Sequence, residues 1–390
     1  FSLMLLEAGL RVTGFEFPVT TTRHVHRGYS NRPDAVWIQR SEGYATVRTN
    51  SRGFRDVEWA AEKPPGTVRI AVLGDSFTEA SQVPAEHRFT ELAAHHLRQT
   101  EACAGSQIEV MNFGTSGYGT AQQLMTWRHE VKAFKPDYVV LAFLTGNDVR
   151  NNSEQLEGDP VRPYFIEQNG ELVLDDSFRD ERLSLARSAG LTAAGYSRVA
   201  QVAYQVFRGI RARRKLEQIR QASPAEAELV ELGLAEPGLS TWIYASPVKK
   251  EHQAAWRITE KLLTQLHYEV SQAGAKFLVV SLTNSIQVHP SQDSRRKFTT
   301  VLRLDDILYP DRRVEEVCRR NRIPVLTLAP RMQAHAQEQH EFLHGFSNTT
   351  PGQGHWNSAG HRVAGRLIGG WLEREIVQPA DSVQPVSHEE

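Results

Sequence analysis

The chain has 390 residues, of which 40% are hydrophobic and 23% are charged, and its formal net charge is -1. A chain of this length and composition can bury a full hydrophobic core. The balanced charge argues against a basic surface for nucleic acid. The two cysteines, Cys103 and Cys318, lie too far apart in the sequence for a CxxC motif or a disulfide framework. No cluster of residues implies a metal or an organic cofactor.

The N-terminal segment allows two interpretations. Residues 1–14 are mostly apolar, but they are too few to span a bilayer. They are either the end of a membrane anchor or a short amphipathic helix that packs on the domain. Their position favours the anchor, and with it a periplasmic or cell-envelope location. Residues 18–65 show no strong periodicity, so we expect residues 1–65 to form an anchor remnant and an irregular lead-in.

After residue 66, apolar strands alternate with helices. Continuous Val, Ile and Leu runs predict strands over 68–73, 108–113 and 137–144, with helices over 89–98 and 119–133 between them. Such an alternation indicates a parallel sheet that is covered on both faces by helices, which places the chain in the α/β class.

A break in this alternation predicts an insertion at about residues 155–250. It begins with a hairpin signal at Asn169-Gly170 and continues as an Ala- and Arg-rich helical stretch over 182–222. The alternation then resumes, with helices over 251–273, 311–321 and 358–375 and strands over 276–282 and 323–328. The main domain is therefore expected over 66–376, and residues 377–390 are expected to be disordered.

Ser76 is the first candidate for chemistry. It follows the apolar strand and Gly74-Asp75, and it precedes a helix. Backbone N–H groups and the positive end of the helix dipole gather at such a point, and a nucleophilic serine needs them to stabilise an oxyanion. The alternative is an ordinary turn in which Ser76 caps the helix.

The loops after the second and third strands also have unusual compositions. Residues 112–119 read NFGTSGYG, in which glycines let the backbone approach a substrate and direct an N–H group toward it. Residues 145–148 read TGND, and the side chain of Asn147 can donate a hydrogen bond to an oxyanion. Taken separately, each loop is equally well read as a common turn.

A histidine candidate lies near the C-terminus. Residues 352–361 read GQGHWNSAGH, which puts His355 in a loop just before a helix, where a general base is accessible yet held by the scaffold. His361 falls one turn inside that helix, and we interpret it as structural.

These four segments, in this order, resemble the serine, glycine, asparagine and histidine blocks of the SGNH (GDSL) hydrolase superfamily. The resemblance covers roughly residues 66–150 and 270–376 and implies a flavodoxin-like, three-layer α/β/α fold with a mainly helical insertion. It implies that Ser76 is the nucleophile and His355 the base. The oxyanion hole would consist of the Ser76 and Gly117 N–H groups and the Asn147 side chain. The lead-in sequence TNSRGFR (49–55) also looks like that of bacterial membrane-associated members.

One position departs from the family pattern. The family usually carries an Asp two or three residues before the histidine, where this chain has Gly352 and Gln353. Three explanations remain: a backbone carbonyl orients His355, a distant carboxylate such as Glu341 or Asp148 replaces the acid, or catalysis is lost. Asp75, Asp148 and Gln353 are candidate supporting residues.

The resemblance implies a serine esterase that removes small acyl groups, above all acetyl, from a carbohydrate or a related ester, through an acyl-enzyme. The expected partner is therefore an acylated small molecule or polysaccharide. Two alternatives are an O-acyltransferase that acts on an exopolysaccharide and a non-catalytic carbohydrate-binding homologue.

Overall fold

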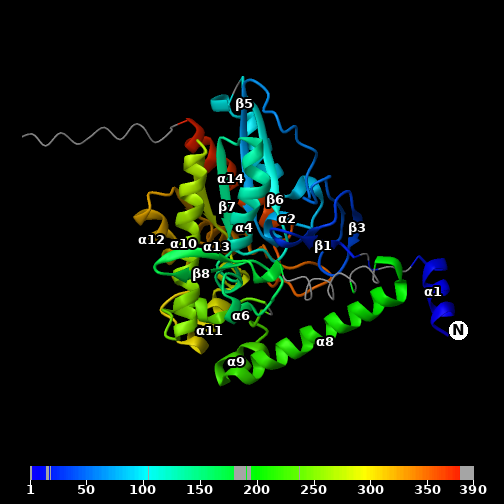
Figure 1. Cartoon of the computed structure of the whole chain (residues 1–390). Helices are drawn as coiled ribbons and strands as arrows, with labels where there is room; N and C mark the ends of the chain where they lie inside the picture. Colours follow the sequence, from blue (N-terminus) through cyan, green and yellow to red (C-terminus); the bar gives the residue numbers. More distant parts are fainter. Residues whose placement is uncertain are drawn as a thin grey trace, which may run out of the picture.

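A parallel sheet forms the centre of the molecule (Figure 1). The structure is a computed structural model that describes residues 2–14, 17, 19–103, 105–179, 190, 195–236 and 238–377. Within them, five strands make the sheet in the order β11-β10-β7-β5-β6, and all neighbours are parallel. The strands are β5 (Thr67–Gly74), β6 (Gln107–Gly114), β7 (Tyr138–Phe143), β10 (Lys276–Ser281) and β11 (Val325–Thr327). This is the flavodoxin-like 2-1-3-4-5 order, which confirms the predicted fold class.

Helices cover both faces of the sheet. One face packs on α4 (Thr120–Thr126), α10 (Lys250–Gln272) and α12 (Tyr309–Arg320). The other face packs on α3 (Phe89–Gln99), α13 (Ala329–Gln339) and α14 (Ser358–Val377). Successive side chains of β5 alternate between these two cores, with Leu73 in the first and Val72 in the second. Each such buried side chain contributes about 1.5–3 kcal/mol to folding.

The predicted strands and most predicted helices are present, with three differences. The helix predicted over 119–133 ends at Thr126 and continues as a π-helical turn, η3 (Trp127–Val131), and a 3-10 turn, η4 (Lys132–Phe134). The helix after Ser76, α2 (Ser76–Glu79), has only four residues. Helices α11 (Gln292–Leu302) and α13 were not predicted.

The lead-in is more ordered than its sequence suggests. It forms two antiparallel hairpins, β1 (Thr21–His24) with β2 (Gly28–Asn31) and β3 (Val36–Gln39) with β4 (Ala45–Arg48). In β4, Ala45 and Val47 are buried while Thr46 and Arg48 are exposed. Strands of four residues contain too few alternations to be recognised, so the expectation of an irregular lead-in was wrong.

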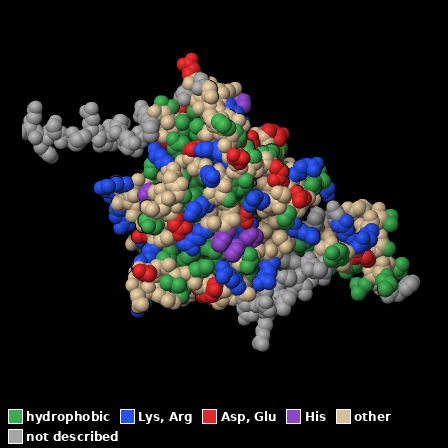
Figure 2. Space-filling view, turned by 45° about the horizontal axis from the view of Figure 1, so that its top comes forward, with side chains coloured by type: hydrophobic (Ala, Val, Ile, Leu, Met, Phe, Trp, Pro, Cys, Tyr) green, Lys and Arg blue, Asp and Glu red, His purple; other side chains and the backbone are tan. Residues whose placement is uncertain are grey.

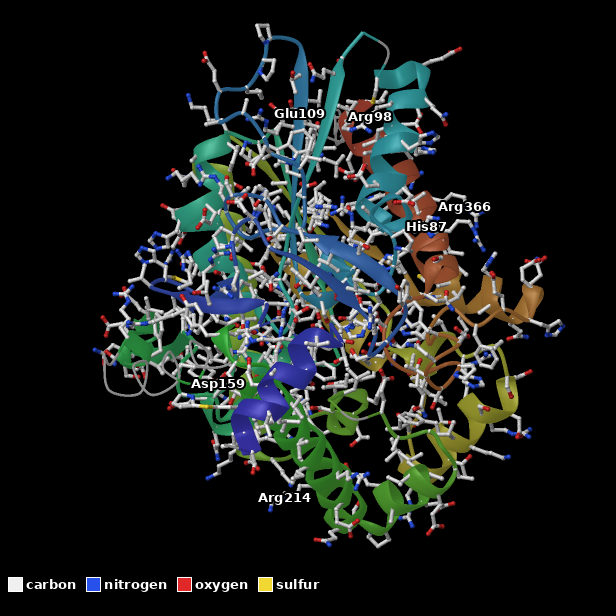
Figure 3. The ribbon with its side chains drawn as sticks, turned by 90° about the vertical axis from the view of Figure 1, so that its right-hand side faces the viewer. His87, Arg98, Glu109, Asp159, Arg214 and Arg366 are labelled. Atoms are coloured by element: carbon white, nitrogen blue, oxygen red, sulfur yellow. The ribbon has the colours of Figure 1, made fainter. Side chains whose placement is uncertain are left out.

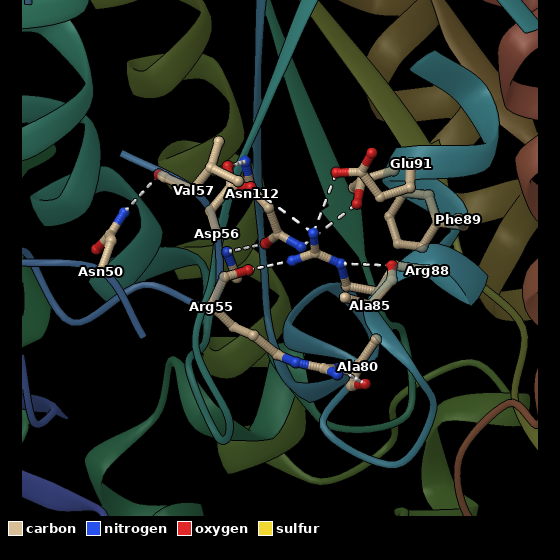
Figure 4. Close-up of polar contacts among 12 residues, drawn as sticks. Asn50, Arg55, Asp56, Val57, Ala80, Ala85, Arg88, Phe89, Glu91 and Asn112 are labelled. Atoms are coloured by element: carbon tan, nitrogen blue, oxygen red, sulfur yellow. Dashed lines mark hydrogen bonds and ion pairs between the residues drawn. The ribbon is translucent and has the colours of Figure 1, made fainter. Parts of the chain in front are cut away.

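A buried arginine fixes the lead-in to the segment that carries Ser76. The guanidinium of Arg55 donates to the backbone carbonyl of Ala80 (Figure 4) and to those of Glu79 (3.2 Å) and Val83 (2.7 Å). Arg88, at the start of α3, donates in turn to the Arg55 carbonyl. Two of these bonds fall on Glu79 and Ala80 at the end of α2, where helical carbonyls lack partners within the helix, and the third falls on the turn that follows.

A second bridge between the same segments involves Asp56. Its carboxylate accepts from the Asn112 N–H of β6 at 2.7 Å (Figure 4) and from the Trp59 indole at 2.7 Å. Burial raises the pKa of Asp56 to about 6, although Arg88 and these hydrogen bonds oppose the shift. The end of the lead-in is thus held against both strands that precede the candidate site.

The opposite, amino end of the sheet is closed by an ion pair. Arg69 of β5 binds Glu109 of β6 at 2.6 Å, and Arg98 of α3 donates to the Ile108 carbonyl at 3.2 Å. Glu109 and Arg98 are labelled at the top of Figure 3, so the carboxyl ends of the strands point to the lower part of that view. Chemistry is expected at those carboxyl ends.

The insertion contains the predicted hairpin, β8 (Tyr164–Gln168) with β9 (Glu171–Asp175), around Asn169-Gly170. Of the helical stretch predicted over 182–222, the structure describes α8 (Arg198–Ala222), and most of the part before it lies outside the described residues. The insertion continues as α9 (Pro224–Glu231) and η6 (Thr241–Tyr244). The predicted disordered tail also lies outside the described residues, apart from Val377 at the end of α14.

The N-terminal helix α1 (Ser2–Val12) packs against α8, which extends from the body of the molecule (Figure 1). Figure 3 shows the two helices together, with Arg214 at the outer side of α8. Glu7 of α1 accepts from the N–H groups of Arg198 (3.1 Å) and Val199 (3.0 Å), at the positive end of α8. These hydrogen bonds lower the pKa of Glu7 to about 2.

The surface carries interspersed acidic and basic side chains (Figure 2). On α1 the apolar residues Leu3, Met4, Leu5 and Leu6 are 50–77% exposed. Among the helices that the structure describes, none has both the length and the apolar character needed to cross a bilayer. The membrane anchor and the envelope location therefore stay predictions.

Arg55→Ala is expected to lower the free energy of unfolding by about 2–4 kcal/mol, because buried carbonyls lose their donors. Arg52→Ala is the matched control. Arg52 lies in the same lead-in, but its side chain is 43% exposed and pairs with Glu130 at 3.1 Å. Its removal should cost less than about 1 kcal/mol. Urea denaturation measures both, and equal losses would contradict the role given to Arg55.

Candidate active site

Ser76 lies where β5 ends and α2 begins. Asp75 caps α2, and its carboxylate accepts from the Phe77 N–H at 2.9 Å. Two glycines allow this helix to sit directly on the strand ends. A Cβ at Gly74 would lie 2.1 Å from Thr78 Oγ1, and one at Gly114 would lie 2.3 Å from the Glu79 nitrogen. The Ser76 hydroxyl is therefore presented at the carboxyl edge of the sheet, half-buried.

A chain of hydrogen bonds joins Ser76 to a histidine and a carboxylate. His355 Nε2 lies 2.7 Å from Ser76 Oγ, and His355 Nδ1 lies 2.6 Å from Glu42 Oε2. The His355 backbone N–H donates to the other oxygen of Glu42 at 2.7 Å. With Nδ1–H donating to Glu42, Nε2 is free to accept the Ser76 proton, which is the arrangement of a serine hydrolase triad.

Glu42 and His355 form an ion pair in which each group shifts the pKa of the other. Burial would raise the pKa of Glu42, but the hydrogen bonds and positive charge of His355 outweigh it and bring the pKa below its usual value. Burial would lower the pKa of His355, but the hydrogen bond and charge of Glu42 outweigh it and raise the pKa. A raised pKa makes His355 a stronger base toward the serine hydroxyl.

Glu42 lies in the turn between β3 and β4, and the C-terminal part of the chain holds this turn. Asn348 accepts from the Gly43 N–H at 3.0 Å and donates to the carbonyls of Arg40 (2.9 Å) and Gly43 (3.1 Å). Gly43 has φ +67° and lies against the Gln82 carbonyl, so a side chain at this position would be both strained and obstructed.

The sequence did not identify Glu42 as a candidate, and its two proposed distant acids were wrong. Glu341 binds Arg362 at 3.1 Å rather than His355. Asp148 is fully buried at the start of α5 (Asp148–Asn151) and accepts from the Leu144 N–H at 3.3 Å. Burial and the nearby Asp75 raise the pKa of Asp148 well above its usual value. The one available signal was the missing acid itself, which requires a carboxylate from elsewhere in the chain.

The third supporting candidate, Gln353, takes a different place. Its side chain donates to the Gly233 carbonyl of the insertion instead of to His355. The same loop is bound to the insertion by a second contact, because Glu236 accepts from the Gly354 N–H at 3.0 Å. His361 is buried, accepts from the Phe89 N–H at 3.3 Å and stacks on the Phe89 ring, as expected of a structural residue.

The loop after β6 presents Gly117. Tyr29 donates to the Ser116 carbonyl at 2.9 Å, and Glu79 accepts from the Ser116 N–H at 2.6 Å. Because a trans peptide points its C=O and N–H in opposite directions, the bond from Tyr29 turns the Gly117 N–H away from Tyr29. Within the described residues, neither this N–H nor that of Ser76 has a protein acceptor. Both are available for a ligand.

The loop after β7 brings Asn147 to Asp75. One of the two side-chain N–H groups of Asn147 donates to Asp75 Oδ2 at 3.0 Å, which leaves the other for a substrate. β7 and β6 flank β5 in the sheet, so the loops that carry Gly117 and Asn147 lie on either side of Ser76. The structure thus brings a nucleophile, a base and an acid together, and Asn147 binds the residue next to the nucleophile, which is the arrangement of a serine hydrolase.

The sequence profile of the GDSL-like Lipase/Acylhydrolase family matches residues 72–363. The chain belongs to this family and is a hydrolase that acts on ester bonds, as the resemblance predicted.

No match is found among curated proteins. Similar solved structures include LAE5, an alpha/beta hydrolase enzyme from the metagenome of Lake Arreo, Spain, with 13% identity over 80% of this chain and 98% of that chain and a TM-score of 0.37. The acetyl xylan esterase AlAXEase has 12% identity over 78% and 99%, with a TM-score of 0.39. The acetylxylan esterase Axe2 from Geobacillus stearothermophilus has 14% identity over 80% and 94%, with a TM-score of 0.37.

Glu42→Gln is expected to lower kcat by roughly 10³-fold, because the imidazolium loses its counter-charge and the tautomer of His355 is no longer fixed. The acid limb of the pH profile of kcat/KM should also move to lower pH. Its position reports the pKa of His355, which Glu42 raises. Steady-state hydrolysis of p-nitrophenyl acetate between pH 5 and 9 measures both effects.

Glu341→Gln is the control for this experiment, because Glu341 pairs with Arg362 away from His355. It should keep the kcat and pH profile of the wild type. The assignment of Glu42 fails if the two variants behave alike.

Proposed function

We propose that this chain is a serine esterase that removes short acyl groups, above all acetyl, from a carbohydrate or a related ester. The observation that carries the proposal is the continuous hydrogen-bonded chain from Ser76 through His355 to Glu42. A serine in the same place that only capped a helix would need neither a histidine at 2.7 Å nor an acid behind that histidine. The chemistry of such a chain is acyl transfer to the serine oxygen.

Acylation begins when Ser76 Oγ attacks the ester carbonyl carbon while its proton moves to His355 Nε2. The negative charge that develops on the carbonyl oxygen is stabilised by the N–H groups of Ser76, Gly117 and Asn147. The C–O bond to the alcohol then breaks, and His355 returns the proton to the departing alkoxide. Glu42 stabilises the imidazolium between these two transfers.

Deacylation repeats the sequence with water. His355 takes a proton from water as its oxygen attacks the acyl carbon, and the bond to Ser76 Oγ breaks as the proton passes to that oxygen. The products are a free carboxylic acid and the unmodified serine. No step requires a group from outside the chain except water.

The preference for short acyl groups rests on two side chains that flank the oxyanion donors. A Cβ at Gly117 would lie 2.7 Å from the Tyr29 hydroxyl. A Cβ at Gly146, next to Asn147, would lie 2.8 Å from the Leu239 side chain. We propose that these residues limit the space beside the acyl carbon. The carbohydrate part of the proposal follows from the family resemblance.

A second candidate is transfer of the acyl group to a sugar hydroxyl, and the insertion favours it. Ser240 of the insertion donates to the Gly146 carbonyl at 3.2 Å, and Gly233 accepts from Gln353 of the histidine loop. A segment that packs on both loops can exclude water from the acyl-enzyme and let another hydroxyl take its place. The non-catalytic alternative was motivated by the absence of a triad acid, and Glu42 removes that motivation.

Ser76→Ala should abolish both turnover of p-nitrophenyl acetate and labelling by a fluorophosphonate probe, because both need the serine oxygen. The wild-type enzyme should hydrolyse the acetate ester faster than the octanoate ester and should release acetate from acetylated xylooligosaccharides. Turnover that survives in the variant would rule out Ser76 as the nucleophile. A preference for octanoate would instead overturn the proposed acyl length.

The choice between water and sugar as acceptor is tested by adding an unacetylated oligosaccharide to the p-nitrophenyl acetate reaction. For an esterase, acetate should account for all of the p-nitrophenol released. For a transferase, mass spectrometry should show acetylated oligosaccharide, with acetate reduced by the same amount.

A further inference from the structure

The insertion contacts the active site through the segment after α9. Apart from the contacts of Gly233 and Ser240, Gly238 accepts from Arg150 of α5 at 2.6 Å. The segment therefore binds the loop after β7 and the loop that carries His355. Its one acidic side chain among the described residues 233–236 and 238–240, Glu236, has no role in the mechanism above.

Glu236 is partly buried, and both of its carboxylate oxygens accept hydrogen bonds. Oε1 accepts from the Gly354 N–H at 3.0 Å, and Oε2 accepts from the Ser285 hydroxyl. Ser285 opens η7 (Ser285–Val288), which follows β10. Burial of a carboxylate is costly unless it is well hydrogen-bonded, so a buried acid that touches no substrate calls for a structural or electrostatic explanation.

The role of Glu236 follows from Gly354, the residue that its carboxylate binds. Gly354 and His355 are consecutive, and their two N–H groups bind two different carboxylates, Glu236 and Glu42 respectively. The Gly354 carbonyl is also fixed, since it accepts from His344 Nδ1 at 2.6 Å. The residue before the catalytic histidine is thus held on both sides.

Gly354 cannot hold its conformation through a side chain of its own. Its φ is +79°, and a Cβ would lie 2.1 Å from Glu42 Oε1. Only glycine fits beside the triad acid, and glycine is the residue with the most conformational freedom. An external hydrogen bond must therefore restrict it.

We propose that Glu236 is a positioning residue that fixes the Gly354 peptide and so directs the His355 ring toward Ser76, which makes the insertion part of the active site. This inference rests on the proposed function, because it gives Glu236 a role in the same acyl transfer. A shift of about 1 Å in the base is enough to lower a rate by roughly 100-fold.

The charge of Glu236 adds an electrostatic effect to the geometric one. Burial raises the pKa of Glu236 to about 7, against the effect of its hydrogen bonds from Ser285 and Gly354. Among neighbouring titratable groups, His355 lowers this pKa and Glu42 raises it. The ionised carboxylate also contributes to the raised pKa of His355. Tyr244 of η6 faces Glu236 as well, but burial and Glu236 raise its pKa well above 10, so it stays neutral.

The test compares Glu236→Ala and Glu236→Gln with the wild type on p-nitrophenyl acetate. Alanine removes the acceptor for the Gly354 N–H, so kcat should fall by about 10- to 100-fold while KM changes by less than about 3-fold. Glutamine keeps an acceptor oxygen without the charge. It should keep kcat within about 3-fold and move the acid limb of kcat/KM to lower pH. Glu341→Ala, a surface control, should match the wild type.

Each outcome decides the proposal. It is overturned if Glu236→Ala keeps the wild-type kcat, or if alanine and glutamine lower kcat equally. If Glu236→Ala fails to fold, as circular dichroism would show, Glu236→Asp takes its place, because its shorter side chain draws the acceptor away from the Gly354 N–H. A wild-type kcat in Glu236→Asp then overturns the proposal. A wild type that neither turns over the ester nor reacts with a fluorophosphonate refutes the proposed function instead, before any variant is compared.

Discussion

The hydrogen bond between Glu42 and His355 is the contact on which the active site depends, and it joins residues 313 positions apart. A carboxylate half-hidden from water is unfavourable by itself, and so is an imidazolium. When the two groups are paired, their mutual attraction offsets the cost of removing each charge from water. The pair therefore forms only if the lead-in is held in place independently. Arg55 does this at one end of the lead-in, and Asn348 does it at the turn beside Glu42.

The rest of the site follows from the order of the strands. In a parallel sheet with the order 2-1-3-4-5, the loops after the first and third strands diverge and leave a crevice at their carboxyl ends. Ser76 follows the first of these strands and Asn147 the third, so the nucleophile and one donor occupy that crevice without any special fold. The loops after these two strands are joined directly, because Asn147 donates a hydrogen bond at 3.0 Å to Asp75, the residue before Ser76. The sheet thus positions the nucleophile and the proposed oxyanion donors, whereas the base comes from the loop before α14 and the acid from the short turn between β3 and β4.

This division explains how much the sequence could predict. The strands of the sheet are continuous apolar runs, and Ser76 and His355 stand in recognisable surroundings, so the fold and these two residues could be predicted. Glu42 could not, because strands of four residues give no periodicity and a hairpin turn that reads Ser41-Glu42-Gly43 is unremarkable without its partner. Distance along the chain gave no guide either. Glu341 is only 14 residues from His355 by number, yet its side chain turns to Arg362.

Glu42 lies outside the range of the family match. The profile covers residues 72–363, which includes Ser76, Gly117, Asn147 and His355 but not Glu42. The acid is therefore supplied from outside the matched range, and Gly352 and Gln353 stand at the loop position where the family resemblance predicts an Asp. Moving the acid off this loop has a physical consequence. A carboxylate two or three residues before the histidine would lie on the same loop and move with the histidine. Glu42 instead binds the histidine from a separate element, the hairpin of β3 and β4. The histidine loop is then free to bind the insertion through Gln353, and the geometry of the base comes to depend on two segments that the sheet does not itself control.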